Sequence, residues 1–417
     1  MNKNYILTGL LILIIILTSG CWDRRELESL GLVQAIGLDL GPGQKGVTVT
    51  TMIAIPSRLG GQQGGGTGDK PGVFLISMDA PSVYEAFNLI NTTINREITL
   101  IQNRLLIFGE EMASHGVQRW IDNLVRYREM RRSLLIFVCK GKAAEILNVQ
   151  PRLENKPSEY INALAALSRR TGMYPTVTIN DFLQKYEAFA QENYLPLIAK
   201  YQRKEGLGTS SEGEQTGEKS KSNTELSKEK EPKKKDDIRF IGSAIFKKDR
   251  MIGTFNNYET QILLLLNNEF REAMLTIEDP LKKGNYLVFR LLATSPVQIQ
   301  YQRRNNVDRF KVKLSLEAEL ISIQSRIDYT QPKLEAFLGR AIAKEIKNRV
   351  DKAVKKAQQE YDSDVFGFGK KVRNAFITSS KYEKYHWPDK FKEAKIQTQV
   401  KVTIRRVGVQ FQPPEIR

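Results

Sequence analysis

A polar stretch in the middle of the chain constrains its fold more than any other feature. From Gln202 to Asp237 the sequence, which includes KEGLGTSSEGEQTGEKSKSNTELSKEKEPKKKDD, contains almost no apolar residue, and its positive and negative charges nearly balance. Such a segment cannot bury enough apolar surface to offset the entropy lost on folding. We therefore predict a disordered polar linker or surface loop at 202–237, with a globular unit on each side.

The N-terminal unit, residues 21–201, mixes strand and helix patterns. The runs LVQAIGLDL and VTVTTMIAI flank GPGQKG, which predicts a β-hairpin. VFLISM, LLIFG and SLLIFVC predict further strands, and amphipathic helices are predicted between them, from Pro81 and from Gly116. Three more helices are predicted at 158–167, at 179–190 and, from a weaker pattern, near Leu195. This alternation predicts an α/β region, built as one unit or as two subdomains.

The C-terminal unit, residues 238–417, has a different pattern. IRFIGSAIFKK and RMIGTF predict a hairpin, and Asn256 and Glu259 have the spacing of a capping box at the start of a helix. YLVFRLLATSPVQIQYQ, RFKVKLSLEAELISI and TQVKVTIRRVGV predict long strands, and the last two alternate between apolar and polar side chains. An apolar stripe from Lys333 to Tyr361 predicts one long helix. We predict an α+β domain, an antiparallel sheet with a long helix across it, so the whole chain mixes the α/β and α+β classes.

The start of the chain predicts export. Lys3 precedes an apolar core, Ile6 to Leu17, that is roughly a dozen residues long and shorter than the ~20 residues of a transmembrane helix. Small residues follow at positions 18–20. A positive start, a short apolar core and small residues are the layout of a signal peptide, which we predict at 1–20.

Cys21 comes directly after the small residues, an arrangement that resembles a bacterial lipobox. In a lipobox the signal peptidase cuts before a cysteine whose sulfur carries a diacylglycerol, and two or more acyl chains such as palmitate anchor a protein stably. We therefore predict Cys21 as the lipid attachment site of a membrane-anchored lipoprotein. Thr18 departs from the usual Leu, Val or Ile three residues before the cysteine, and an ordinary signal peptide or an uncleaved short anchor is the alternative.

The composition agrees with an exported globular protein. At 41% hydrophobic residues, both units can bury a core. Lipidation of Cys21 would leave Cys139, the second of two cysteines, without a disulfide partner, and its apolar surroundings predict a buried structural thiol. The net charge of +17 suits an anionic membrane surface. We predict no nucleic-acid partner, because the sequence has no zinc-finger or ribonucleoprotein motif.

Motifs for catalysis are missing from the sequence. It contains two histidines, His115 and His386, and no G-x-S-x-G, H-E-x-x-H or C-x-x-C arrangement. The glycine-rich stretch 60–72 is not a phosphate-binding loop, since Asp69 separates Gly68 from the following lysine. We therefore predict that the protein is not an enzyme and has no catalytic residue, no cofactor and no metal site.

The sequence resembles one family over nearly its whole length. SGCWDRREL followed by LGLVQAIGLDL is similar to the start of the C subunits of nutrient germinant receptors, the lipoproteins of spore germination in Bacillus, Clostridium and their relatives. NRLLIFGEEMASHGVQRWIDNLVRYREMRRSLLIFVCKGKAAEIL resembles the second segment of the family. GSAIFKKDRMIGTFNNYETQILLLL, YDSDVFGFG and VKVTIRRVG resemble its C-terminal part. The stretch 202–237 is longer and richer in lysine than expected for the family, which suggests a lineage-specific insertion.

The resemblance implies mixed α/β domains and a membrane-anchored, non-enzymatic subunit on the outer face of the inner spore membrane. Its implied partners are a transmembrane A subunit and a transporter-like B subunit, which together sense nutrients and trigger ion release. Cys21 is the one residue whose role is carried over, as the lipid attachment site. The alternative function is a solute-binding lipoprotein of a membrane transporter. Such proteins have two similar α/β lobes around a ligand cleft, whereas the two halves predicted here differ.

Overall fold

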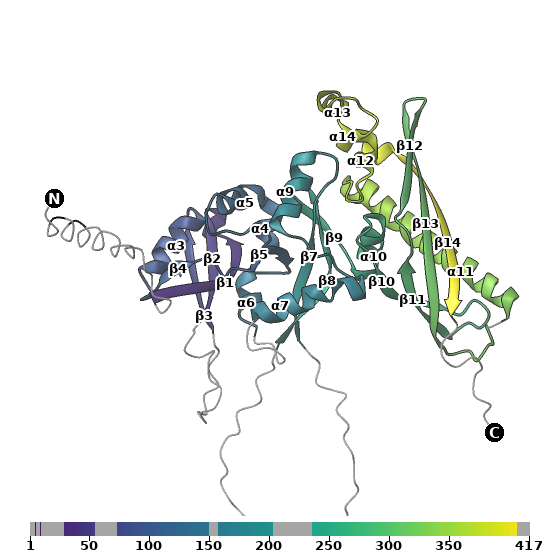
Figure 1. Ribbon diagram of the computed structural model, residues 1–417, viewed down its shortest axis with the longest axis horizontal. Helices are drawn as coiled ribbons and strands as arrows, with labels where there is room; N and C mark the ends of the chain where they lie inside the picture. Colours follow the sequence, from purple (N-terminus) through teal and green to yellow (C-terminus); the bar gives the residue numbers. More distant parts are fainter. Residues whose placement is uncertain are drawn as a thin grey trace, which may run out of the picture.

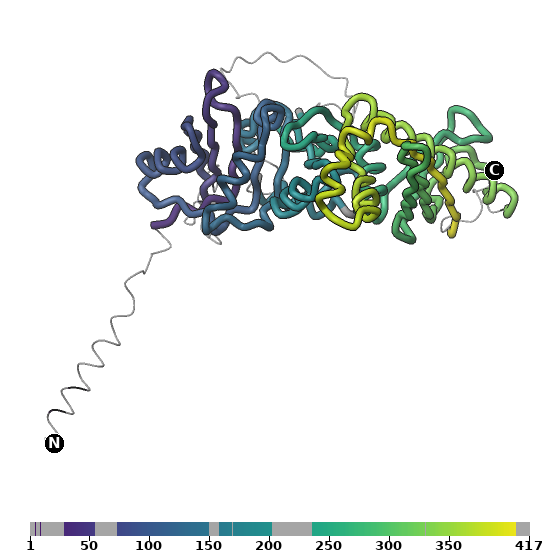
Figure 2. Tube along the Cα trace, turned by 90° about the horizontal axis from the view of Figure 1, so that it is seen from above, coloured from purple at the N-terminus to yellow at the C-terminus, as the bar shows by residue number. Residues whose placement is uncertain are grey.

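The structure, a computed structural model, describes residues 29–54, 73–149, 157–202, 236–329 and 331–406, together with Tyr5 and Gly9. Cys21, most of the predicted signal peptide and residues 203–235 of the polar stretch lie outside this part of the chain. The described strands form two sheets at opposite ends of an elongated molecule (Figure 1). The view from above shows the same elongation (Figure 2).

The first sheet has nine strands within the described residues, in the order β3-β2-β1-β5-β6-β7-β8-β9, with the short β4 beside β1. The strands are β1 (Leu30–Leu40), β2 (Val47–Ala54), β3 (Val73–Ala80), β4 (Glu97–Thr99), β5 (Leu105–Gly109), β6 (Leu135–Cys139), β7 (Tyr194–Gln202), β8 (Asp236–Lys247) and β9 (Arg250–Phe255). The central strands β1, β5, β6 and β7 run parallel, and antiparallel pairs flank them on both sides. The predicted first hairpin is confirmed as β1 and β2, joined through the 3-10 turn Pro42–Gln44.

Helices cover both faces of the first sheet. They are α3 (Val83–Asn91), α4 (Glu110–His115), α5 (Gln118–Val125), α6 (Ala143–Leu147), α7 (Pro157–Ala166), α8 (Ser168–Thr171), α9 (Ile179–Ala188) and α10 (Asn257–Leu266). Along β5, Leu106 and Phe108 join a core with α3, α4 and α5, whereas Leu105 and Ile107 join a second core with α6 and α7. A strand buried on both faces explains the continuous apolar runs, and the predicted α/β class is confirmed.

The prediction of a helix near Leu195, which rested on a weak pattern, is wrong. Residues Tyr194–Gln202 form β7, which pairs with β6 on one side and β8 on the other. Pairing on both sides outweighs a weak helical pattern, and Pro196 would also disturb a helix there.

The hairpin expected in the C-terminal unit forms part of the first sheet. Strand β8 pairs with β7 from Tyr194↔Ile245 to Gln202↔Asp236, and β9 then pairs with β8. The polar stretch therefore connects two neighbouring strands of one sheet, and the division expected at residue 237 does not coincide with the gap between the sheets. That gap follows α10, which begins with the predicted capping box of Asn256 and Glu259.

The second sheet contains five strands in the part of the chain that is described: β10 (Glu272–Glu278), β11 (Tyr286–Ala293), β12 (Gln298–Arg304), β13 (Val307–Ile323) and β14 (Lys395–Arg406). Strand β13 pairs along one side with β11 and β12, which the sequence predicted as one strand, and along the other side with β14. The pairs are antiparallel except β13 with β14, which is parallel because the chain crosses over between them.

The predicted long helix is confirmed as α11 (Pro332–Lys356), which continues into a π-helical turn, Ala357–Tyr361. Its stripe of Leu338, Ile342, Ile346 and Val350 is buried. The helix crosses the second sheet beside β14 (Figure 1). Three short helices follow, α12 (Phe368–Arg373), α13 (Ser379–Tyr385) and α14 (Trp387–Lys390), before a 3-10 turn, Phe391–Glu393, leads into β14.

Gly242 is required at an irregularity in the pairing of β8 with β7, where the register shifts between Phe240 and Gly242. Its φ is +130°, and a Cβ there would lie 2.0 Å from the Phe255 carbonyl oxygen. We expect Gly242→Ala to lower the free energy of unfolding by about 3 kcal/mol or more, because the clash is with backbone. Gly43→Ala is the matched control, since Gly43 also has a positive φ, +62°, but no atom within 4 Å of the added Cβ. It should cost about 1 kcal/mol. Equal effects of the two variants in urea denaturation would contradict this assignment.

Candidate functional site at the junction of the two sheets

The residues singled out in the sequence do not come together as a reactive centre. Cys21 lies outside the described residues. Cys139, at the end of β6, is fully buried, as predicted, and burial raises the pKa of its thiol, which therefore stays protonated. His115 is exposed at the end of α4, and His386 is exposed between α13 and α14.

Metal-ligand clusters and membrane-spanning helices are both absent from the described residues. No three or more His, Cys, Asp or Glu side chains converge there as metal ligands would. No helix among those residues is both long enough and apolar enough to cross a bilayer.

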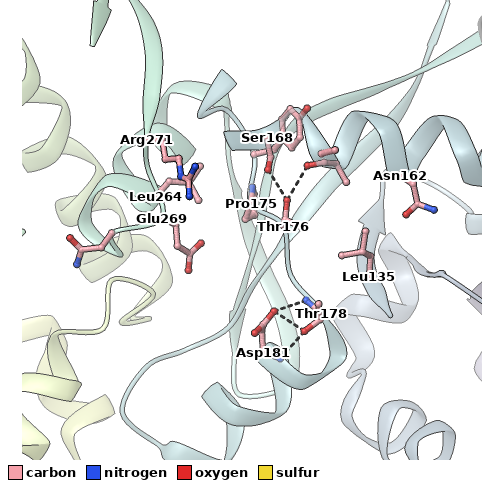
Figure 3. Close-up of a pocket in the computed structure, with 14 residues that line it drawn as sticks. Leu135, Asn162, Ser168, Pro175, Thr176, Thr178, Asp181, Leu264, Glu269 and Arg271 are labelled. Carbon is pink, nitrogen blue, oxygen red and sulfur yellow. Dashed lines mark hydrogen bonds between the residues drawn. The ribbon is translucent and has the colours of Figure 1, made fainter. Parts of the chain in front are cut away.

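A cleft lies where the first sheet meets the second, with a volume of about 750 Å³. One wall comes from α7, α8 and the segment leading into α9, and the other from the end of α10 and the segment between α10 and β10 (Figure 3). Its polar lining is supplied by Asn162, Ser168, Thr176, Thr178, Asp181, Asn268, Glu269 and Arg271.

Most of the polar groups on the first wall already have partners. The Asp181 carboxylate accepts hydrogen bonds from the Thr178 backbone N–H at 2.9 Å and from its hydroxyl at 2.7 Å, which completes the capping box of α9. The hydroxyls of Ser168 and Thr176 lie 2.7 Å apart. This wall is therefore organised by its own hydrogen bonds (Figure 3), and the charges that could meet a ligand come from the opposite wall.

Glu269 connects the cleft to a partly buried charge cluster with Lys185 and Tyr194. Its carboxylate accepts a 2.5 Å hydrogen bond from the Tyr194 hydroxyl and lies 3.9 Å from the Lys185 ammonium. The ammonium also lies 3.7 Å from the centre of the Tyr194 ring. Burial lowers the pKa of Lys185 to about 8, although Glu269 opposes this shift, and burial also raises the pKa of Tyr194. The cluster ties the end of α10 to α9 and β7.

The segment after α11 forms a second polar connection around Asp364. The carboxylate of this buried residue accepts hydrogen bonds from the backbone N–H groups of Phe368, at 3.1 Å, and Gly369, at 2.7 Å, and from the indole N–H of Trp387, at 2.8 Å. Burial raises the pKa of the carboxyl to about 6, even though all three hydrogen bonds favour the charged form. One side chain therefore organises both the turn before α12 and the start of α14.

The same segment joins the two sheets. The Asp364 carbonyl accepts the backbone N–H of Glu192 at 2.9 Å, and the Ser363 hydroxyl donates to the carbonyl of Phe246 in β8 at 2.6 Å. On the other side, the Trp387 ring packs 5.5 Å from that of Phe310 in β13. Asp364 thus holds a segment that contacts both sheets.

Sequence reasoning missed both of these connections. YDSDVFGFG was noted only as a family-like segment, and Lys185, Tyr194 and Glu269 were not noted at all. Glu269 lies far along the chain from Tyr194, and Trp387 lies well beyond Asp364. No spacing pattern in the sequence therefore reveals these contacts. The glycine pair in FGFG carried the available signal. A Cβ at Gly369 would lie 2.4 Å from the Trp387 ring, which is the close approach that a glycine permits.

The raised pKa of Asp364 predicts a specific dependence of stability on pH. The Asp364 carboxyl has a pKa of about 6 in the folded protein, whereas an aspartate in the unfolded chain has a pKa of about 4. The protonated carboxyl therefore stabilises the folded state at low pH, and this contribution to the free energy of unfolding is lost as the pH rises through 6. Asp364→Asn cannot titrate. The free energy of unfolding of the wild type minus that of the variant should therefore fall by up to about 3 kcal/mol from about pH 4 to about pH 7.

The measurement is urea denaturation across this pH range. Asp389→Asn, which removes an exposed carboxylate of α14, controls for the loss of one negative charge. A difference between wild type and Asp364→Asn that stays constant with pH would contradict the assignment.

Known proteins match this chain in both of its halves. The family model for the spore germination protein N-terminal domain matches residues 23–200, and the model described as spore germination B3/GerAC like, C-terminal, matches residues 241–408. The YfkR protein of Bacillus subtilis (strain 168), whose name places it among spore germination proteins, is 26% identical over 413 residues, which are 99% of each chain. Spore germination protein KC of the same organism is 25% identical over 418 residues, covering 99% of this chain and 98% of its own.

A solved structure has the same fold. The crystal structure of the GerBC protein superimposes with a TM-score of 0.52 at 15% sequence identity and covers 91% of this chain and 99% of that one. The predicted mixed fold class is confirmed by this likeness as well as by the two sheets. With both domain models matched in order, and with relatives aligned from end to end, the chain belongs to the spore germination family of germinant receptor C subunits.

Proposed function

We propose that this chain is a lipid-anchored, non-enzymatic subunit of a spore nutrient germinant receptor. It acts by protein–protein contact with the A and B membrane subunits during spore germination. The observation that carries the proposal is the ordered match of both halves to the domain models of this family. The connections around Asp364 and Glu269 support it, because they join the two sheets into one body that can present fixed surfaces to its partners.

The proposed anchor is a diacylglycerol on Cys21 after removal of a signal peptide at 1–20, on the outer face of the inner spore membrane. From Cys21 to the start of β1 the chain is about nine residues long and reaches at most about 30 Å. The anchor would therefore hold the first sheet near the bilayer. The second sheet lies at the other end of the molecule (Figure 1) and is free to meet a partner farther from the attachment point.

Cys21→Ala tests the anchor. We expect the variant to leave the membrane fraction or to remain unprocessed, and spores that carry it to respond poorly to nutrient, because the two acyl chains needed for stable anchoring are lost. Cys139→Ala is the matched control, since it removes the other, buried cysteine and should leave the protein in the membrane. Membrane retention and normal germination of the Cys21→Ala variant, measured by fractionation and by spore germination assays, would contradict the proposal.

The alternative function, a solute-binding lipoprotein of a transporter, would use the junction cleft. Its volume of about 750 Å³ falls within the range of small-molecule sites, ~300–1,000 Å³. However, the two halves around it are unlike each other, a doubly covered α/β sheet and a mostly antiparallel sheet with one long helix, whereas solute-binding proteins have two similar lobes.

Calorimetry separates the two functions. We expect the chain to give no binding heat at micromolar concentrations with amino acids, sugars or nucleosides, because the two carboxylates of the cleft, Asp181 and Glu269, are held by the protein's own contacts. Micromolar binding of one of these solutes that is weakened in Glu269→Gln would instead favour the solute-binding function.

A further inference from the structure

The loop between α12 and α13, residues 374–378, presents a large apolar side chain to water. Ile377 in this loop is 93% exposed, the highest fraction among the large apolar side chains of the described residues. Phe189, at the end of α9, is 62% exposed and lies beside α13, because its carbonyl accepts a 2.9 Å hydrogen bond from the Tyr382 hydroxyl. We call the loop 374–378 together with Phe189 the α12–α13 tip.

The backbone at Phe189 also disfavours a large side chain. Its φ is +49°, in the left-handed region where glycine or asparagine usually ends a helix. An aromatic ring at this position gains little from packing, since most of it is exposed, and its backbone is strained. Single exposed apolar residues are common on protein surfaces, but here two of them lie on neighbouring segments.

The exposure of Ile377 is fixed by the structure on both sides of it. The Phe376 ring packs with its centre 6.0 Å from that of Tyr382 and 5.0 Å from that of Tyr385. The Thr378 hydroxyl accepts a backbone N–H in the first turn of α13 and so caps this helix. Both neighbours of Ile377 are therefore held by the protein, and its side chain points away from them into solvent.

Cations surround the tip. Residues 370–385 carry one carboxylate, Glu383, against five basic side chains: Lys370, Lys371, Arg373, Lys381 and Lys384. None of these five forms an ion pair within the described part of the chain. The neighbouring β12–β13 hairpin adds Arg303, whose guanidinium lies 4.9 Å from the centre of the Tyr385 ring. The apolar tip is thus enclosed by positive charge that the protein does not neutralise.

This combination fits a lipid surface better than a protein surface. The centres of protein interfaces are depleted in lysine, and an apolar anchor residue there usually fills a pocket surrounded by other apolar contacts. At the boundary of a bilayer, apolar side chains enter between the headgroups while lysine and arginine remain at the level of the phosphates. Anionic lipids attract such cations in addition.

We propose that the α12–α13 tip docks on an anionic lipid bilayer, with Ile377 and Phe189 entering the headgroup region and Lys371 and Lys381 contacting anionic headgroups. This inference rests on the proposed function, because the anchor at Cys21 places the chain at a membrane. In the view from above, the start of β1 and helices α12–α14 lie along the same long side of the molecule (Figure 2), so one bilayer meets both. The anchor raises the local concentration of lipid at the tip, which makes a second, weak contact effective.

The test places a fluorescent reporter beside Ile377 in the full chain, anchored through Cys21 in lipid vesicles. Ala375→Cys, at an exposed position of the loop, is labelled with nitrobenzoxadiazole, whose emission shifts to the blue on leaving water. Cys139 is fully buried and stays unlabelled. We expect the blue shift in vesicles of phosphatidylcholine with phosphatidylglycerol, its absence in phosphatidylcholine alone, and its reversal by added salt, which screens exposed charges.

Two variants of exposed side chains measure the contributions of the tip, and both should keep the melting temperature of the parent. Ile377→Ser should lower the equilibrium constant for docking, obtained from the salt titration, about tenfold. Lys371→Glu with Lys381→Glu should lower it about 25-fold or more, about fivefold for each cation lost.

Lys282→Glu with Lys283→Glu is the matched control for charge. These exposed lysines lie in the turn between β10 and β11, next to the Ile323 end of β13, whereas Tyr385 bonds to Asp308 near its other end, about 50 Å away. The control should leave docking within about threefold of the parent, since its charges lie well beyond the screening length from the tip.

Several outcomes would overturn the inference. These are a reporter that stays in water on anionic vesicles, equal docking on phosphatidylcholine alone, docking indifferent to the tip variants, and shielding of the reporter that requires spore membrane proteins, which would assign the tip to a protein partner. Flotation of the vesicles separates the two proposals. A chain that floats with a water-exposed reporter contradicts the docking of the tip alone, whereas a chain that does not float contradicts the anchor as well.

Discussion

The arrangement of this molecule depends on a carboxylate buried between its two sheets. Asp364 is shielded from water, and three donors surround it, so its charge is partly compensated by geometry that can form only when α12 and α14 are in place. A buried charge that loses its donors is strongly destabilising, so the side chain favours one arrangement of this segment over others. Because the segment also bonds to β8 and packs on β13 through Trp387, the position of the second sheet follows from the same interaction.

This construction suits a protein that works by contact. A subunit that passes a signal through its surfaces must keep those surfaces in fixed relative positions. The connections around Asp364 and Glu269 do this by joining the two sheets through a few residues. The Lys185–Glu269–Tyr194 cluster does so at the cleft, where charges that could otherwise attract a solute are directed at one another. The cleft is then the boundary between the two sheets. In the proposed function, partner proteins bind to the outer surface of the molecule and not in the cleft.

The sequence predicted the elements well and their assembly less well. Alternation in RFKVKLSLEAELISI and the stripe of α11 led directly to β13 and the long helix, because burial of one face leaves a period in the sequence. The same reasoning assigned β8 and β9 to the C-terminal unit, since strand patterns record which side chains are buried and not which neighbour supplies the hydrogen bonds. Helices α12 to α14 were missed because they are short and held by Asp364 and an aromatic cluster rather than by an apolar period. The partners of Lys185 and Asp364 could not be predicted either, because these contacts leave no period in the sequence. The family resemblance, carried by CWDRREL and later motifs, was the strongest guide to function.

The pairing of β7 with β8 changes the meaning of the long lysine-rich stretch. Gln202 and Asp236 face each other across two adjacent strands, so the thirty-odd residues between them enter and leave the molecule at one point. The entropy of closing a loop grows slowly, by about 0.6 kcal/mol for each doubling of its length. The length and sequence of this connection can therefore change in evolution with little loss of stability of the folded protein. For the same reason, it is a suitable place to insert an epitope or a fluorescent reporter.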